Sequence, residues 1–222
     1  MSGDGERGGP SDGLPSKAIV LIVDDDAMVR RSLDSLLRSV DLETMLIGSA
    51  DQLLNATIPN KPGCIVLDVR LPGTSGLDLQ DELVKRGIEL PIIFMTGFGD
   101  IPMTVKAMKA GAVDFLSKPF REQDMLDAVA TALRQDARRL SLATANEQLR
   151  KRYETLTPRE REIMSNVVAG LMNKQIAGKM GLSEITVKIH RGHVMRKMEV
   201  KSLADLVRVG ELLGVSRGSQ QP

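Results

Sequence analysis

Four acidic or basic side chains among the first 120 residues of the chain follow short apolar runs. They are Asp24, Asp25, Asp68 and Lys118, and Thr96 has the same position after a further run. Several carboxylates at one place repel each other unless a cation neutralises them, and Mg²⁺ suits such oxygen ligands. A carboxylate beside Mg²⁺ can attack a phosphoryl group and form an aspartyl phosphate, while an ammonium and a hydroxyl hold the phosphoryl oxygens.

The elements expected around these residues would bring them together. Stretches of helical periodicity alternate with five short apolar runs, at 18–23, 44–47, 64–67, 91–95 and 114–117. This alternation predicts an α/β fold with a doubly wound, mainly parallel sheet of five strands. Because such sheets bind ligands at the carboxyl ends of their strands, we expect the carboxylates, the ammonium and the hydroxyl to share one cleft.

Each of these residues taken alone also has an ordinary structural explanation. An aspartate after a strand is often a loop residue or a helix cap, Thr96 fits a turn, and Lys118-Pro119 fits a loop with a solvated lysine. Only their joint placement favours phosphoryl chemistry. A phosphotransferase or phosphatase for a small substrate would use the same cleft, but the short loops after the strands leave no visible substrate pocket. A flavin-binding domain is disfavoured, because its phosphate loop would need Gly, Ser and Thr where this chain is acidic.

From about residue 121 onward the sequence has only helical patterns. Apolar residues at 126, 130, 133, 137 and 140 fit either an ordinary amphipathic helix or a helix paired with another. Cap and stop signals then predict four short helices, beginning at Pro158, Lys174, Glu184 and Leu203. A short helix, a turn containing glycine and a longer basic helix are typical of an all-α, four-helix domain of the helix-turn-helix type.

The longer basic helix, predicted over 184–198, has an apolar side and a side with Thr186, Lys188 and Arg191. Such a helix can lie in the major groove of DNA, where Lys and Arg reach guanine and phosphate. A solvated basic helix face is the alternative explanation. His190 and His193 are three residues apart, but no carboxylate or thiol is near them in sequence, so we do not expect a metal site there.

Charge separates the same two parts of the chain. Residues 18–135 carry 12 Lys and Arg against 17 Asp and Glu (net −5), whereas residues 136–222 carry 16 against 9 (net +7). The basic part is therefore a candidate for nucleic-acid binding.

The one cysteine, Cys64, rules out an internal disulfide and a Cys-based metal cluster. No run is long and apolar enough for a membrane span or a secretory signal, so we expect a cytoplasmic protein.

Residues 18–134 resemble the receiver domain of two-component response regulators. The resemblance lies in VDDD at 23–26, DVRLPGTSGL at 68–77, MTG at 95–97, AMKAGAVDF at 107–115 and KPF at 118–120. It implies that Asp68 is the phosphoacceptor and that Thr96 and Lys118 contact the phosphoryl oxygens. It also implies that Mg²⁺ is bound by Asp24, Asp25, Asp68 and the backbone carbonyl of Arg70.

The same resemblance implies a cis peptide bond between Lys118 and Pro119. It places Phe115 at the position of the family's switch aromatic, where many members have tyrosine. Because phenylalanine lacks the hydroxyl, a switch formed by Thr96 and Phe115 must depend on packing alone.

A second resemblance, to the LuxR-type (FixJ-like) DNA-binding domain, covers about 60 residues of the C-terminal part. It lies in LTPREREI at 156–163, NKQIA at 173–177 and SEITVKIHR at 183–191. It implies that the helix over 184–198 is the recognition helix. The implied groove contacts are Lys188, Ile189 and Arg191, and the residues implied near phosphates are Thr186, Asn173 and Lys174. Gly192 lacks the side chain with which other members contact a base, which leaves the preferred DNA sequence open.

These observations predict a transcriptional regulator rather than an enzyme. We expect a tail over 1–17, a receiver domain over 18–134, a linker helix over 135–154, a DNA-binding domain over 155–214 and a tail over 215–222. A histidine kinase would phosphorylate Asp68, and phosphorylation would promote homodimerisation and binding to double-stranded promoter DNA. RNA polymerase is a further expected partner, and a membrane is not.

Overall fold

The computed structural model describes residues 17–97 and 101–215, so nearly all of both predicted tails lies outside the described residues. The chain divides into two compact units between Leu140 and Ser141. This boundary falls within helix α5 (Glu122–Glu154) and within the predicted linker over 135–154. None of the described helices combines the length and apolarity needed to cross a bilayer.

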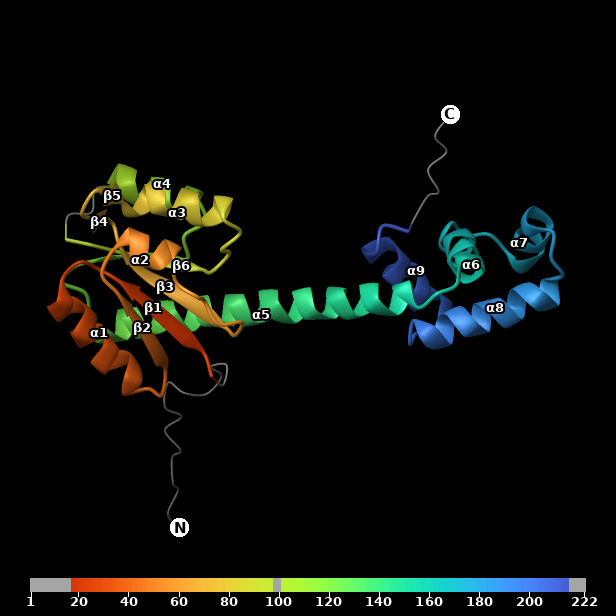
Figure 1. Ribbon diagram of the computed structural model, residues 1–222, viewed down its shortest axis with the longest axis horizontal. Helices are drawn as coiled ribbons and strands as arrows, with labels where there is room; N and C mark the ends of the chain where they lie inside the picture. The colour runs from red at the N-terminus through yellow and green to blue at the C-terminus, as the bar shows by residue number, and fades with distance from the viewer. Residues whose placement is uncertain (1–16, 98–100, 216–222) are drawn as a thin grey trace, which may run out of the picture. The chain divides into compact units, whose positions relative to one another are not determined.

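The N-terminal unit contains the predicted five-stranded parallel sheet, with the strand order β2-β1-β3-β6-β7 (Figure 1). The strands are β1 (Ile19–Val23), β2 (Glu43–Ile47), β3 (Gly63–Asp68), β6 (Ile92–Thr96) and β7 (Asp114–Ser117). Every residue of β1, β3 and β6 is buried. Continuous burial is expected for central strands of a parallel sheet, because helices cover both of its faces.

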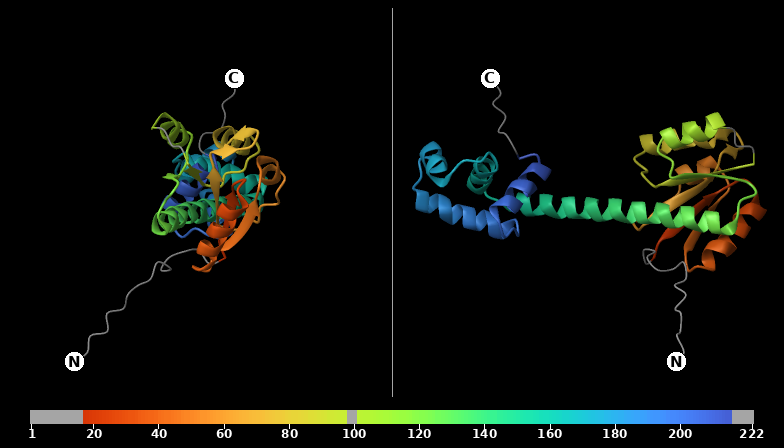
Figure 2. Two further views of the ribbon diagram at one scale, coloured as in Figure 1. Left: turned by 90° about the vertical axis from the view of Figure 1, so that its left-hand side faces the viewer. Right: turned by 180° about the vertical axis from the view of Figure 1, so that it is seen from behind.

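Helices pack on both faces of this sheet, as Figures 1 and 2 show. One hydrophobic cluster joins the sheet to α2 (Ala50–Leu54), α3 (Gly76–Lys85) and α4 (Ile101–Lys109). A second cluster joins the opposite face to α1 (Ala27–Arg38) and to the N-terminal part of α5. The α/β doubly wound architecture predicted from the sequence is therefore confirmed.

A short hairpin follows β3 that the sequence pattern did not predict. Strands β4 (Arg70–Leu71) and β5 (Thr74–Ser75) pair antiparallel, and Gly73 lies between them with φ +80°. This left-handed backbone conformation strains any residue with a Cβ, so glycine is favoured at the turn. The hairpin returns the chain to β3, where α3 begins at Gly76.

The C-terminal unit contains the four predicted short helices around one apolar cluster. They are α6 (Pro158–Val168), α7 (Asn173–Met180), α8 (Glu184–Lys197) and α9 (Leu203–Leu212). The hydroxyls of Thr157, Ser183 and Ser202 cap α6, α8 and α9. The helix predicted to begin at Lys174 begins one residue earlier, at Asn173. There Gln175 Oε1 accepts a hydrogen bond from Met172 N at 2.8 Å, which leaves the Asn173 side chain available to α8.

Glu160 connects the first and third helices of this unit. Its Oε2 atom accepts hydrogen bonds from Thr157 N at 2.8 Å and from Lys197 Nζ at 2.7 Å, and the residue is 4% exposed. Burial raises the pKa of the Glu160 carboxyl, but the hydrogen bonds from Lys197 and Thr157 outweigh burial and hold the pKa below its ordinary value.

Glu160→Gln is expected to lower the free energy of unfolding by about 1–2 kcal/mol at pH 7, because the charge-assisted bond to Lys197 is lost. Since the folded-state pKa is lowered, the carboxylate stabilises the fold above its ordinary pKa of 4.5, and this contribution is lost as the pH falls through the folded-state value. Urea denaturation at neutral and acid pH measures both effects. Glu162→Gln, which removes the surface partner of Arg159, is the control and should cost less than about 0.5 kcal/mol. A Glu160→Gln deficit that stays constant down to low pH would contradict this account.

Candidate functional site

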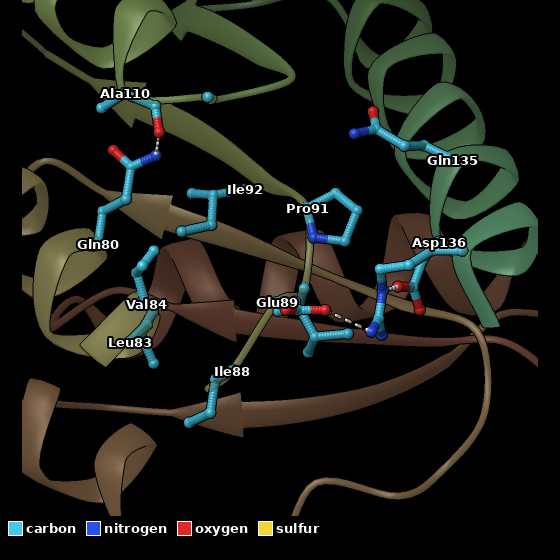
Figure 3. Close-up of a pocket in the computed structure, with 13 residues that line it drawn as sticks. Gln80, Leu83, Val84, Ile88, Glu89, Pro91, Ile92, Ala110, Gln135 and Asp136 are labelled. Carbon is cyan, nitrogen blue, oxygen red and sulfur yellow. Dashed lines mark hydrogen bonds and ion pairs between the residues drawn. The ribbon is translucent and has the colours of Figure 1, made fainter. Parts of the chain in front are cut away.

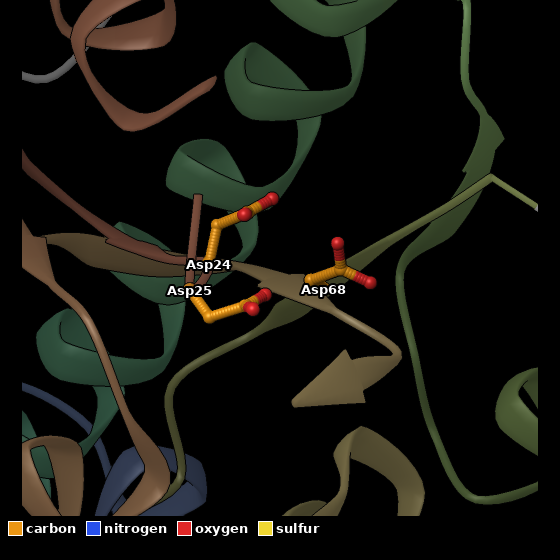
Figure 4. A group of neighbouring side chains, drawn as sticks. All are labelled: Asp24, Asp25 and Asp68. Carbon is orange, nitrogen blue, oxygen red and sulfur yellow. The ribbon is translucent and has the colours of Figure 1, made fainter. Parts of the chain in front are cut away.

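The side chains predicted to converge lie at one edge of the sheet. Asp24 directly follows β1, Asp68 is the last residue of β3, and Lys118 directly follows β7. Lys118 Nζ donates hydrogen bonds to Asp24 Oδ2 at 2.6 Å and to Asp68 Oδ2 at 2.5 Å. Oxygen atoms of Asp24, Asp25 and Asp68 lie within 4.8 Å of one another (Figure 4). Residues from distant parts of the sequence meet here because parallel strands end at the same edge.

The three consecutive aspartates after β1 have different environments. Asp24 is 1% exposed, and its Oδ1 accepts a hydrogen bond from Asp26 N at 2.8 Å. Asp25 is exposed and shares the site with Asp68. Asp26 caps α1, because its Oδ1 accepts a hydrogen bond from Met28 N at 2.7 Å. Only the first two of the three carboxylates therefore belong to the acidic cluster.

A main-chain and a side-chain hydrogen bond hold the carboxyl group of Asp68 in place at the end of β3. Its Oδ1 accepts a hydrogen bond from Arg70 N at 2.9 Å, and its Oδ2 faces Lys118. Gly76 begins α3 beside this residue, where a Cβ atom would lie 2.7 Å from the main-chain oxygen of Asp68. A side chain at position 76 would therefore displace the strand end that carries Asp68.

Burial and hydrogen bonding shift the pKa values of Asp24 and Lys118. Burial raises the pKa of Asp24, while the hydrogen bond from Lys118 opposes this rise. Burial also disfavours the charged form of Lys118, but its hydrogen bonds to Asp24 and Asp68 outweigh this effect and raise the pKa of the ammonium. The three neighbouring carboxyl groups supply the oxygen ligands that suit a divalent cation.

Thr96 ends β6 at the same edge of the sheet as the acidic cluster, and Phe115 lies on the neighbouring strand β7. Thr96 is the last residue of β6 and is fully buried, and its main-chain oxygen accepts a hydrogen bond from Lys118 N at 2.6 Å. The peptide bond between Lys118 and Pro119 is cis, as the resemblance implied. Phe115 is half-buried on β7 and pairs with Phe94 of β6, with ring centroids 6.4 Å apart.

The opposite end of β3 contacts a buried aspartate of α5 that the sequence pattern did not predict. Asp136 of α5 is fully buried and accepts hydrogen bonds from Gly63 N at 2.9 Å and from Arg139 Nε at 2.8 Å. Arg139 also pairs with Glu89 at 3.0 Å, beside a cavity of about 330 Å³ (Figure 3). The signal in the sequence was an acid three residues after Leu133, at a position where an apolar residue would be expected. This network fastens α5 to the start of β3, far from the acidic cluster.

Some of the predicted DNA-contacting residues of α8 are exposed, whereas others form hydrogen bonds within the protein. Lys188 and Ile189 are exposed, whereas Thr186 Oγ1 lies 2.8 Å from the capping hydroxyl of Ser183. Arg191 Nη1 donates a hydrogen bond to Asn173 Oδ1 of α7, so these two predicted DNA contacts are partners of each other. Lys174, next to Asn173, is exposed. Another side of α8 packs into the core through Val187 and Val194.

A doubly wound sheet with paired aspartates, a central aspartate, a threonine and a lysine at its carboxyl edge, followed by a helix-turn-helix unit, defines a receiver-type response regulator. Comparison with known families agrees with this class. The response regulator receiver domain matches residues 20–130, and the luxR family of bacterial regulatory proteins matches residues 154–210. The chain belongs to the response regulators that join these two domains, as the sequence resemblance predicted.

Curated relatives extend over nearly the whole chain. Nodulation protein W of Bradyrhizobium diazoefficiens is 58% identical over 201 residues, which cover 90% of this chain and 88% of that protein. Response regulator protein TmoT of Ectopseudomonas mendocina is 47% identical, with coverage of 89% and 90%. Transcriptional regulatory protein FixJ of Azorhizobium caulinodans is 44% identical, with coverage of 91% and 96%.

Solved structures show the same combination of folds. The response regulator StyR superposes with a TM-score of 0.79 at 46% identity, covering 88% of this chain and 99% of that chain. Full-length FixJ from B. japonicum superposes with a TM-score of 0.53 at 36% identity, covering 91% and 100%.

Proposed function

We propose that this chain is a transcriptional regulator whose binding to double-stranded DNA is controlled by phosphorylation of Asp68. The observation that carries this proposal is the position of Lys118 Nζ between Asp24 and Asp68, next to the exposed carboxylate of Asp25. The relatives support it, because they include proteins named as response regulators and transcriptional regulators.

The cluster has the donor set for Mg²⁺. Asp24, Asp25 and Asp68 would bind the ion together with the backbone carbonyl of Arg70, and the ion would neutralise charge on the incoming phosphoryl group. Asp68 would attack the phosphorus of a phosphohistidine in a partner kinase. The new bond joins an Asp68 oxygen to phosphorus, and the bond from phosphorus to the imidazole nitrogen breaks. Lys118 would hold one phosphoryl oxygen.

Phosphorylation at Asp68 adds about two negative charges and three acceptor oxygens beside the end of β6. The Thr96 hydroxyl would move toward these oxygens, and Phe115 would fill the space that it leaves. Phe115 can act only through packing against its neighbours, such as Phe94. The altered surface would favour a homodimer in which two DNA-binding units engage a two-fold symmetric site.

We assign the receiver domain to 18–134, the linker helix to 135–154 and the DNA-binding domain to 155–214. In the DNA-binding domain, Lys188, Ile189 and Arg191 would contact the groove. Thr186, Asn173 and Lys174 would lie near phosphates, with the Arg191–Asn173 hydrogen bond orienting both side chains. A histidine kinase and RNA polymerase are the expected protein partners, in the cytoplasm.

Mass measurement and gel-shift titration with and without acetyl phosphate and Mg²⁺ test the proposed function. The phosphorylated protein is expected to form a dimer and to bind a promoter fragment more tightly than the unphosphorylated protein. Identical mass and identical affinity in both states would overturn the proposed control by phosphorylation.

Lys188→Ala is expected to weaken DNA binding about tenfold, because a groove-facing cation that contacts a base contributes about 1–3 kcal/mol. Fluorescence anisotropy at several salt concentrations measures the affinity and its salt dependence. Lys201→Ala removes an exposed cation from the same unit outside α8 and is the matched control. An equal loss in both variants would show that only the general positive charge matters.

A further inference from the structure

Helix α8 carries an apolar surface that the core of its unit does not use. Val187 and Val194 are fully buried, whereas Ile185 and Ile189 are 73% and 54% exposed. Residues four apart lie on one side of a helix, one turn from each other. Neither isoleucine belongs to the hydrophobic cluster formed by the described residues of this unit. The pair is therefore an exposed apolar patch on a helix already anchored by its other side.

Gly192 continues this patch, since it lies seven residues after Ile185 in the interior of α8. A Cβ atom at position 192 would meet nothing within 4 Å among the described residues around the helix, and the residue has ordinary helical geometry. Glycine in the interior of a helix is destabilising relative to alanine. Because neither packing nor backbone geometry requires glycine here, a surface that approaches α8 from outside would explain it.

The charge around this patch indicates what kind of surface approaches. Lys188 lies beside Ile189, and Arg196 follows on the same helix; both are exposed. Residues 155–222 carry 11 Lys and Arg against 6 Asp and Glu. A polyanion with apolar groups between its charges matches this arrangement. The major groove of DNA has phosphates on both sides and the C5-methyl groups of thymine on its floor.

We propose that Ile185, Ile189 and Gly192, here called the apolar strip, read thymine methyl groups in the major groove. The two isoleucine side chains contact the methyl groups, and Gly192 allows the helix axis to approach the bases closely. This inference rests on the proposed function of α8 in DNA binding. Under this proposal Ile185 is a specificity-determining residue. At position 192, close apolar contact takes the place of the hydrogen bond that a longer side chain would make to a base.

The test compares thymine with deoxyuridine, which lacks only the methyl group. A duplex selected from a random pool with the phosphorylated full-length protein is made in both versions, and fluorescence anisotropy gives the affinity for each. The protein is expected to lose about fourfold in affinity for each contacted methyl group that is removed, the value expected for one buried CH₂-sized group. Equal binding of the two versions would overturn the proposal, whereas failure to select any duplex would overturn the proposed function itself.

Variants separate the role of the apolar strip from a general role in folding. Ile185→Ala is expected to reduce the preference for thymine about fourfold, and Ile185→Ala with Ile189→Ala to abolish it. Val84→Ala, which truncates a side chain of α3 that is 66% exposed, is the control and should leave the preference unchanged. An equal loss on both duplexes in the Ile185 variant, at an unchanged melting temperature, would overturn the reading of methyl groups.

Gly192→Ala is expected to raise the melting temperature and to lower the affinity for DNA. The added methyl group enters open space and improves the helix, so a melting transition of the chain should rise by about 4 °C. The same methyl group would hold the helix away from the bases, so DNA affinity should fall. A rise in both stability and affinity would overturn the role of Gly192. Unchanged DNA affinity in Ile185→Ala, with a loss of transcription by RNA polymerase, would assign the apolar strip to a protein partner instead.

Discussion

Asp68→Asn is expected to reduce phosphate incorporation from acetyl phosphate to background, since the amide has no charged oxygen with which to attack phosphorus. The substitution preserves shape, and the amide oxygen can still accept the hydrogen bond from Arg70 N. Phosphate-affinity gel electrophoresis with Mg²⁺ present measures incorporation directly. The phosphorylation-dependent gain in DNA affinity should disappear with it, while binding by the unphosphorylated protein should persist, because α8 lies in the other unit.

Asp81→Asn is the matched control for this experiment. Asp81 is an exposed carboxylate on α3, so its loss should leave both incorporation and DNA affinity unchanged. Undiminished labelling of the Asp68 variant would place the phosphoacceptor elsewhere. Persistence of the affinity gain in an unlabelled variant would show that the donor acts on DNA binding by another route.

Lys118→Met is expected to lower the free energy of unfolding by about 2 kcal/mol in the absence of divalent ions. Removing one partner of a fully buried ion pair costs about 3–5 kcal/mol, and the smaller value allows for the Lys118 side chain being 23% exposed. Without its ammonium, the carboxylate of Asp24 is left 1% exposed among other negative charges. Millimolar Mg²⁺ should restore stability to the variant by more than it stabilises the unsubstituted protein, because the ion replaces a lost charge partner.

Urea denaturation with and without Mg²⁺ checks this expectation. Lys61→Met is the control, since it removes the lysine of an ion pair whose acid, Glu43, is 60% exposed; it should cost less than about 1 kcal/mol and respond to Mg²⁺ as the unsubstituted protein does. Equal stabilisation of both variants by Mg²⁺ would show that Lys118 is not a charge partner at the cation site.

The sequence alone predicted the architecture and most of the acidic cluster. Alternating apolar runs and helical stretches are local patterns, and a parallel sheet carries the ends of its strands to one edge. Asp68 at the end of β3 and Lys118 after β7 therefore had to approach each other. The helices of the C-terminal unit were equally local, because Thr157, Ser183 and Ser202 sit at their starts and cap them.

Tertiary contacts decided what neighbouring residues of the same type do. Asp24, Asp25 and Asp26 are equivalent in composition, but only the fold turns the first inward and makes the third a helix cap. The pairing of Arg191 with Asn173 joins two helices that helical periodicity treats separately.

Buried charge and exposed apolar surface were also beyond the sequence pattern. Asp136 reads as an interruption of an apolar stripe until Gly63 and Arg139 supply its hydrogen bonds. The 73% exposure of Ile185 is known only from the structure. Periodicity reports which side of a helix a residue occupies, whereas the partner on that side comes from a distant segment and exists only once the chain has folded.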